Sequence, residues 1–282
     1  MSDDVSPSSG FEGTSKPFRS TRHENSTPLD YDPSIPRIGR RESEPHSSEV
    51  SYIYDVLDTN FPDDRVVWDL HHYFFLEDSE VDIQYDISFF RGYRIPFSLS
   101  SYKAAEHQNR IPDMAINIIS KSTWSNDFSV NLEISRRIGI KVYIIFNPYL
   151  QYPRVYKAPF LRLYLLTEEG HFLEKDLKVA LTGGESILNQ DLLVSVESLP
   201  FKIGLVELDQ KHQGDLNRYR IIFVDKQSSE ILQTKAGREK ERADQEKERA
   251  DQEKERADQA EEKIKRLEEQ LKKSKGKIQE AT

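Results

Sequence analysis

The chain has 282 residues, no cysteine, 36% hydrophobic and 32% charged side chains, and a formal net charge of −9. The absence of cysteine excludes disulfides, thiolate metal sites and cysteine nucleophiles. Residues 46–234 hold 27 acidic and 19 basic side chains, an excess that argues against a broad basic surface for nucleic acid or anionic membranes but leaves room for a small metal-assisted site.

The first segment, residues 1–45, is rich in Ser, Pro, Asp, Glu and Arg, with breakers such as "SPSSG" and "DPSIP". So little apolar surface cannot offset the entropy lost on ordering, which predicts a disordered arm. The N-terminus lacks the basic start and apolar run of a secretory signal, and no stretch reaches the roughly eighteen apolar residues that a membrane span needs. We therefore expect a soluble, cytoplasmic protein with no membrane partner.

The second segment, residues 46–234, has the apolar patterning of a folded domain. The stretch "SSEVSYIYDVLDTNF" predicts a helix that Ser47 or Ser48 can cap, with one apolar face made by Val50, Ile53, Tyr54 and Leu57. The β-branched and aromatic runs "RVVWDLHHYFF" and "VDIQYDISFF" predict a hairpin. The loop that follows, residues 91–110, is longer than a structural connection needs.

Further along, "DMAINIIS" predicts a buried strand, residues 124–138 a helix that Gly139 can end, and "IKVYIIF" a second buried strand. Strands that are apolar throughout, joined by a helix, indicate parallel strands covered on both faces. Shorter strands are expected at "FLRLYLL", "LPFKIGLVEL" and "RYRIIFV", and the hairpins make the sheet mixed. The predicted fold class is therefore α/β, with a mixed sheet flanked by helices.

The third segment, residues 235–282, contains "EKERADQ" three times in succession. One alanine per heptad is too thin a seam for a coiled coil, whereas Arg242 can pair with Glu246, and Lys240 with Asp244, at i, i+4 spacing. These pairs predict a long, solvated, charged helix. A weak homodimer through this helix can form only at its one proper a/d seam, which consists of Ala260, Ile264, Leu267 and Leu271.

One residue of the strand "DMAINIIS" does not fit a buried strand. Asn117 interrupts an otherwise apolar run, and a buried amide costs about 1–3 kcal/mol unless something bonds it. Either a hydrogen bond satisfies this amide, or the strand carries a site, or the position once held another residue.

The succession "VVWDLHHYFF", "VDIQYDISFF", "SYKAAE", "IPDMAINIIS", a helix and "GIKVYIIFNP" resembles the restriction endonuclease-like family within the PD-(D/E)XK nuclease superfamily. The resemblance covers residues 46–180 well and 181–234 loosely, and the charged helical tail is also similar to tails common in that family. It implies a restriction endonuclease-like fold and metal-dependent cleavage of DNA. In such enzymes two or so carboxylates hold Mg²⁺ and a lysine assists the attacking water.

The resemblance makes Asp86 the first metal-binding carboxylate and places Asn117 where the second is expected. The family commonly carries its lysine on the next helix, where this chain has Asn131, although Asp127 is retained. The catalytic positions implied are therefore Asp86, Asn117 and Asn131, in a degraded metal site, with Glu49 at an acidic position often near such sites. Three of them also have a structural interpretation: Asp86 as a strand-end acid bonded to backbone, Asn117 as a satisfied core amide, and Glu49 as an exposed helix acid.

Three functions are compatible with these residues. The favoured one is a nuclease-fold domain with a degraded metal site, weak or inactive as a nuclease and kept for binding or assembly. The second is an active Mg²⁺-dependent DNA endonuclease in which Glu49, Asp127 or Glu133 supplies the missing group. The third is a structural scaffold that uses the charged helix as a spacer. His71 and His72 are expected to be structural, because neighbouring strand residues point to opposite faces.

Overall fold

The computed structural model describes residues 44–280, with side chains for 46–267, apart from residues 78, 94, 96–98, 120–123, 149–155, 184, 186 and 209–218. The helices are α1 (Glu44–Asn60), α2 (Trp124–Asp127), α3 (Val130–Ile138) and α4 (Lys235–Glu280), with two short 3₁₀ segments, η3 (Ala104–His107) and η4 (Gln190–Leu192). One sheet contains β1 (Arg65–Leu76), β2 (Ser79–Phe90), β3 (Tyr102–Lys103), β4 (Met114–Ile118), β5 (Val142–Asn147), β6 (Phe160–Leu166) and β7 (Phe172–Asp176). A second contains β8 (Val179–Leu181), β9 (Val194–Ser195), β10 (Phe201–Glu207) and β11 (Tyr219–Asp225).

The first sheet is mixed, with strand order β3-β1-β2-β4-β5-β6-β7. β1 and β2 form the predicted antiparallel hairpin. β4 and β5 lie side by side and run parallel, as expected for two fully apolar strands joined through a helix. All residues of both strands are buried, because helices or the second sheet cover each face.

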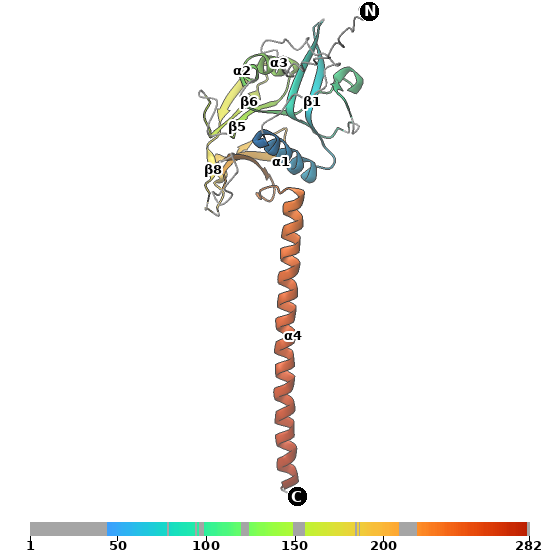
Figure 1. The fold of residues 1–282 in the computed structure, drawn as a ribbon, viewed down its shortest axis with the longest axis vertical. Helices are drawn as coiled ribbons and strands as arrows, with labels where there is room; N and C mark the ends of the chain where they lie inside the picture. Colours follow the sequence, from blue (N-terminus) through green and yellow to red (C-terminus); the bar gives the residue numbers. More distant parts are fainter. Residues whose placement is uncertain are drawn as a thin grey trace, which may run out of the picture. The chain divides into compact units, whose positions relative to one another are not determined.

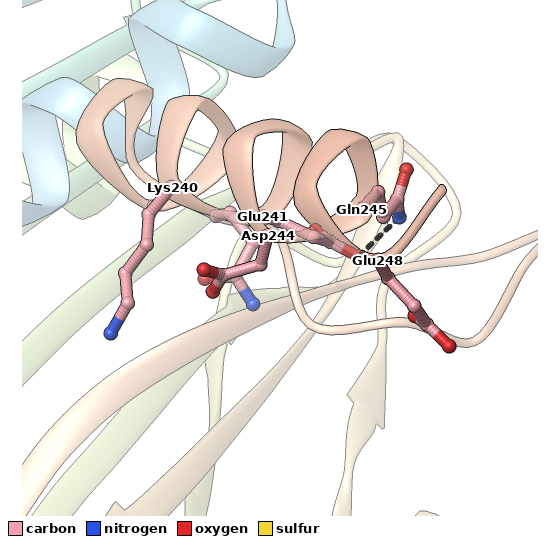
Figure 2. Close-up of a pocket in the computed structure, with 7 residues that line it drawn as sticks. Lys240, Glu241, Asp244, Gln245 and Glu248 are labelled. Atoms are coloured by element: carbon pink, nitrogen blue, oxygen red, sulfur yellow. Dashed lines mark hydrogen bonds between the residues drawn. The ribbon is translucent and has the colours of Figure 1, made fainter. Parts of the chain in front are cut away.

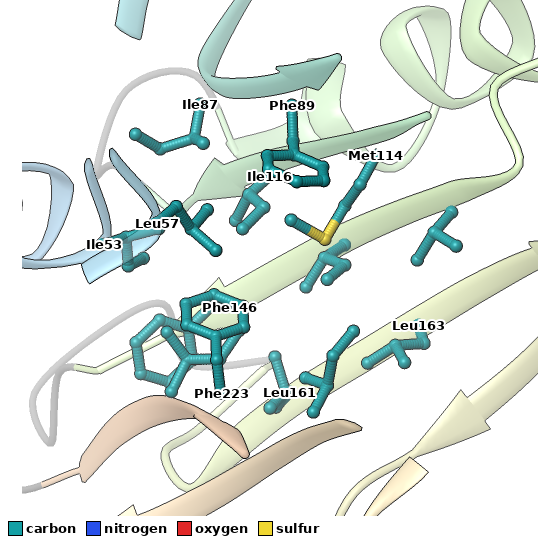
Figure 3. Packing of buried hydrophobic residues seen from close by; sticks show 14 of the residues in the cluster. Ile53, Leu57, Ile87, Phe89, Met114, Ile116, Phe146, Leu161, Leu163 and Phe223 are labelled. Atoms are coloured by element: carbon teal, nitrogen blue, oxygen red, sulfur yellow. The ribbon is translucent and has the colours of Figure 1, made fainter. Parts of the chain in front are cut away.

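α1 and the second sheet cover one face of the first sheet, and α2 and α3 cover the other (Figure 1). α1 and the second sheet share one hydrophobic cluster with one face, and in Figure 3 Ile53 and Leu57 of α1 point toward Ile116 and Phe146 of the strands. α2 and α3 belong to a separate cluster on the other face. The predicted fold class, α/β with a mixed sheet flanked by helices, is confirmed.

α1 confirms the predicted helix and its apolar face but begins earlier than expected. Val50, Ile53 and Leu57 are buried, and Tyr54 packs against the same cluster. The helix starts at Glu44, so the prediction that Ser47 or Ser48 caps it is wrong. Pro45 stands in the first turn, where the backbone needs no N–H donor.

The single helix expected over residues 124–138 is broken into α2 and α3. Ser129 leaves the helical conformation, with φ −129° and ψ −89°. The ring of the neighbouring Phe128 stacks on Tyr156, with ring centroids 3.9 Å apart, so a contact distant in sequence overrides the local helical pattern. Gly139 ends α3 as predicted, with a φ of 90° that suits glycine.

The strands expected at "LPFKIGLVEL" and "RYRIIFV" exist as β10 and β11, but they form a separate sheet and do not extend the first. β10 is apolar on both sides: Phe201 and Ile203 join the cluster shared with α1, and Val206 joins a smaller cluster on the far side. The outer strand of the first sheet, β7, is exposed along most of its length and carries Glu174, Lys175 and Asp176. Such a charged edge does not accept another strand readily.

The predicted charged helix is present as α4, and its start is tied to the end of α1. Arg238 donates to the backbone oxygen of Thr59 (3.3 Å) and to the side chain of Asn60, which in turn donates to the backbone oxygen of Gln233 (2.8 Å). No helix in the described part of the chain is long and apolar enough to cross a membrane. The predicted disordered arm lies outside the described residues, except that residues 44 and 45 open α1.

Candidate functional site

Asp86 and Asn117 lie next to each other where β2 and β4 separate. The backbone ladder between these strands ends at the pair Ile87–Ile116. Beyond it, the N–H of Asp86 donates to Oδ1 of Asn117 (3.4 Å), and the N–H of Ile118 donates to Oδ2 of Asp86 (2.6 Å). The two side chains therefore continue the ladder by bonding the backbone of the opposite strand.

The β1–β2 hairpin is distorted at the level of Asp86. Asp69, which lies opposite Asp86 in the register, has a φ of 47°, a left-handed conformation that costs a non-glycine residue about 1 kcal/mol or more. The side chain of Gln84 donates to that of Asp69. Residues two apart on a regular strand share a face, yet Tyr85 and Ile87 belong to clusters on opposite faces. The alternation of side chains along β2 therefore shifts at Asp86, which lies between Tyr85 and Ile87.

A buried hydrogen-bond network centred on Asp127 satisfies the amide of Asn117. Nδ2 of Asn117 donates to Oδ1 of Asp127 (2.7 Å) and to the hydroxyl oxygen of Tyr143 (3.1 Å). Nδ2 of Asn131, one turn after Asp127 on α3, donates to the same carboxylate oxygen (3.0 Å). The Tyr143 hydroxyl donates to the backbone oxygen of Asp127 (3.2 Å). Both amide hydrogens and the amide oxygen of Asn117 are thus used.

The charge of this network depends on pH near neutrality. Burial first, and then the negative charge of Asp86, raise the pKa of the Asp127 carboxyl to about 7, against the opposing effect of the two amide donors. Nε2 of His46, a buried residue of α1, lies 3.2 Å from Oδ2 of Asp86. Around neutral pH, a proton on Asp127 removes the repulsion between the two acids.

These residues do not fit the Mg²⁺ site that the resemblance implies. Oδ2 of Asp86 accepts from the backbone, Oδ1 of Asp127 accepts from two amides, and the oxygen of Asn117 accepts from Asp86. Mg²⁺ needs several oxygen ligands in near-octahedral geometry. Among the residues that the structure describes, no three His, Asp or Glu side chains gather closely enough to hold a metal ion. Asp86 as a metal ligand stays a prediction.

Glu49 of α1 contacts the second sheet. Its carboxylate is fully buried and forms an ion pair with Arg220 of β11 (3.0 Å). The guanidinium of Arg220 also lies over the ring of Tyr52, 4.3 Å from its centroid. The structure thus gives Glu49 a packing partner instead of the exposed position expected for a helix acid. Glu133 also lies apart, half-exposed and paired with Arg136 (2.7 Å).

Comparison with known proteins gives similarity of limited extent, and only to solved structures. No family model matches the chain, and no curated protein matches it. Among solved structures, it is similar to the crystal structure of "a putative nuclease belonging to DUF820" from Anabaena variabilis, with 18% sequence identity and a TM-score of 0.37. The match covers 56% of this chain and 74% of the other. A match of this extent carries no conclusion about the activity of this chain.

The two histidines of β1 have structural surroundings, as expected. His71 lies 2.8 Å from the carboxylate of Asp82. His72 is fully buried, with Nδ1 2.8 Å from the backbone oxygen of Leu70 and its ring 5.3 Å from that of Tyr85. Burial lowers the pKa of His72 to about 3, so this ring is neutral at physiological pH.

Two residues that contact Asn117 or Asp86, namely Tyr143 and His46, were not predicted from the sequence. Tyr143 gave a signal of the same kind as Asn117, a polar atom inside the apolar run "IKVYIIF", but a tyrosine is common in buried strands and attracts no notice. His46 gave none, because it lies at the border between the arm and the first helix. The structure brings together Asp86, Asn117 and Asn131 through Asp127, whereas the ion pair of Glu49 is with Arg220.

Proposed function

We propose that residues 44–234 form a restriction endonuclease-like domain in which a former catalytic metal site has become part of the folded core. The domain has little or no nuclease activity and is kept for binding or assembly. The observation that carries this proposal is the amide of Asn117, whose oxygen and both hydrogens are bonded inside the protein. A metal-dependent nuclease needs a carboxylate oxygen available to a cation at that place.

Electrostatics explains why an amide suits this position when no cation is bound. A carboxylate at position 117 would meet the acid Asp127 at hydrogen-bonding distance in a buried place, with Asp86 on the neighbouring strand. Carboxylates that share a site raise one another's pKa, so they take up a proton or bind a cation. The amide of Asn117 removes this requirement, because it donates to Asp127 where an acid would repel it.

DNA is the first partner to test, because the resemblance implies a nuclease ancestry. The excess of acids over bases in residues 46–234 restricts any such contact to a small surface, since a broad acidic surface repels phosphates. Assembly through the charged helix is the other route by which such a domain can act.

The proposal is tested by incubating the full chain with supercoiled plasmid DNA and Mg²⁺ or Mn²⁺. We expect no cleavage beyond that of an Asp86→Asn control purified in the same way. Cleavage by the unmodified chain that the Asp86→Asn control lacks would overturn the proposal. A second variant, Asn117→Asp, tests the ancestry: we expect Mn²⁺ to raise its thermal unfolding midpoint and to leave that of the unmodified chain unchanged.

The rival function is an active endonuclease in which another carboxylate replaces the missing group. Of its three candidate carboxylates, Asp127 is the one to test. Glu49 and Glu133 are each paired with an arginine, whereas Asp127 lies close enough to Asp86 for their charges to interact. An enzyme that used Asp127 as a ligand would need it ionised, so its metal-dependent cleavage would rise with pH through about 7. The plasmid assay repeated at pH 6 and pH 8.5 distinguishes this function from an inactive site.

A further inference from the structure

The helix α4 changes character part-way along its length. Every seventh residue from Ala243 through Ala250 and Ala257 to Ile264 is apolar, and this marks position a of a heptad. Three residues after each of the first two alanines stands a glutamate, whereas Ala260 follows Ala257 at the same spacing. A continuous a/d seam therefore begins only at Ala257.

The seam contains large apolar side chains that nothing in the described chain covers. Ile264 and Leu267 lie three residues apart on one face of α4, with 56% and 55% of their surface exposed. In sequence, Leu271 and Ile278 continue position a. Apolar side chains repeated at this spacing favour pairing with another helix.

The charged residues that flank the seam are complementary to those of a second, parallel copy of the same helix. In a parallel pair of identical helices, the residue before each a position faces the residue five places further along the partner. Within the repeats this rule sets Arg242 against Lys247, and Arg249 against Lys254, both pairs of like charge. Beyond them it sets two bases against two acids, Arg256 against Glu261 and Lys263 against Glu268.

We propose that α4 joins two copies of this chain as a parallel, in-register coiled coil confined to residues 256–280, while residues 239–255 stay apart as single helices. An antiparallel pair would set the residues before position a against each other, bringing Arg256 and Lys263 against bases and Glu261 against acids. Charge complementarity therefore selects the parallel arrangement. The inference does not depend on the state of the Asp86 site.

The charge pattern of the repeats favours single helices. Glu246 lies four residues after Arg242 and three before Arg249, so basic and acidic side chains alternate along the surface. Figure 2 shows Lys240, Asp244 and Glu248 extending from the first turns of α4. The shallow hollow beside them is lined by charged and amide side chains, which do not form a seam for a second helix.

Sedimentation velocity of the full chain tests the charge pairing. We expect a concentration-dependent dimer that Arg256→Glu with Lys263→Glu weakens strongly, because all facing charges are then acidic. Adding Glu261→Lys and Glu268→Lys should restore the dimer. The matched control, Arg242→Glu with Arg249→Glu, changes the net charge equally within the repeats and should not weaken it. A monomer at all concentrations, or a fourfold variant that fails to dimerise while circular dichroism shows it helical, would overturn the proposal.

Cysteine cross-linking tests the direction and the extent of the pairing, because the chain has no other thiol. Ile264→Cys places two thiols side by side only in a parallel, in-register dimer. Ala243→Cys occupies the same heptad position inside the repeats. Under mild oxidation we expect Ile264→Cys to form a disulfide-linked dimer about tenfold faster than Ala243→Cys, because pairing raises the effective thiol concentration. Equal rates for the two variants would show that the pairing is not confined to residues 256–280.

Discussion

The buried acid Asp127 should make the protein less stable as the pH rises from about 4 to about 7. Its carboxyl has a pKa near 7 in the folded chain and about 3.9 when unfolded. Between these values the folded state binds more protons than the unfolded state, so the free energy of unfolding falls with increasing pH. A shift of about three units corresponds to roughly 4 kcal/mol, which is fully lost above the folded pKa.

The substitution Asp127→Asn isolates this effect. The new amide keeps an oxygen to accept the bonds from Asn117 and Asn131 but carries no charge. We expect the variant to exceed the unmodified chain in stability by about 2–4 kcal/mol at pH 8.5, and to differ from it by less than about 1 kcal/mol at pH 4.

Urea titrations of both proteins at several pH values, followed by circular dichroism, measure the difference directly. Other titrating groups cancel, because both chains share them. Glu133→Gln, an exposed acid paired with Arg136, serves as the control and should show no comparable pH dependence. A difference between the Asp127→Asn variant and the unmodified chain that is constant from pH 4 to pH 8.5, or that grows as the pH falls, would refute the reasoning.

Three further substitutions test other parts of the fold by the same urea titration. Asn117→Asp should cost about 2–4 kcal/mol at pH 8.5, because it replaces two donated hydrogen bonds with repulsion from Asp127; equal stability would show that the amide bonds contribute little. Glu49→Ala should cost about 3 kcal/mol, since it leaves the charge of Arg220 unpaired against α1, whereas a cost below 1 kcal/mol would contradict the buried pair. Gly139→Ala should cost about 1 kcal/mol, because a φ of 90° strains an alanine backbone. The added Cβ would lie 3.5 Å from Ile111, an ordinary contact, so a larger loss of stability would indicate a clash.

Elements with a strong local pattern were predicted well. The alternation of "VDIQYDISFF", the apolar runs of β4 and β5, and the spacing of Val50, Ile53 and Leu57 each carry their structure within a few residues. The break between α2 and α3 does not, because it depends on the contact of Phe128 with Tyr156. The second sheet was also missed, since sequence patterns identify strands but not the sheet that they join.

Some contacts of the candidate site could likewise be predicted from the sequence, and others could not. The neighbouring positions of Asp86 and Asn117 follow from the order of strands. Asn131 contacts Asp127 as the predicted continuous helix would have it, although the helix breaks between these two residues. The ion pair of Glu49 joins residues 171 positions apart, which no local pattern reveals. The left-handed backbone of Asp69 has only a weak local signal, because aspartate is enriched at positive φ but adopts it uncommonly.

The perfect repetition of "EKERADQ" gives the tail an adjustable reach. One unit of seven residues adds about 10 Å to an α-helix and rotates it by about 20° short of two full turns. Gain or loss of a unit by copying error in the coding sequence would therefore lengthen or shorten the arm in fixed steps, while the coiled coil proposed for residues 256–280 kept its alignment. Chains that differ only in the number of units should pair equally well and hold their folded heads at different separations.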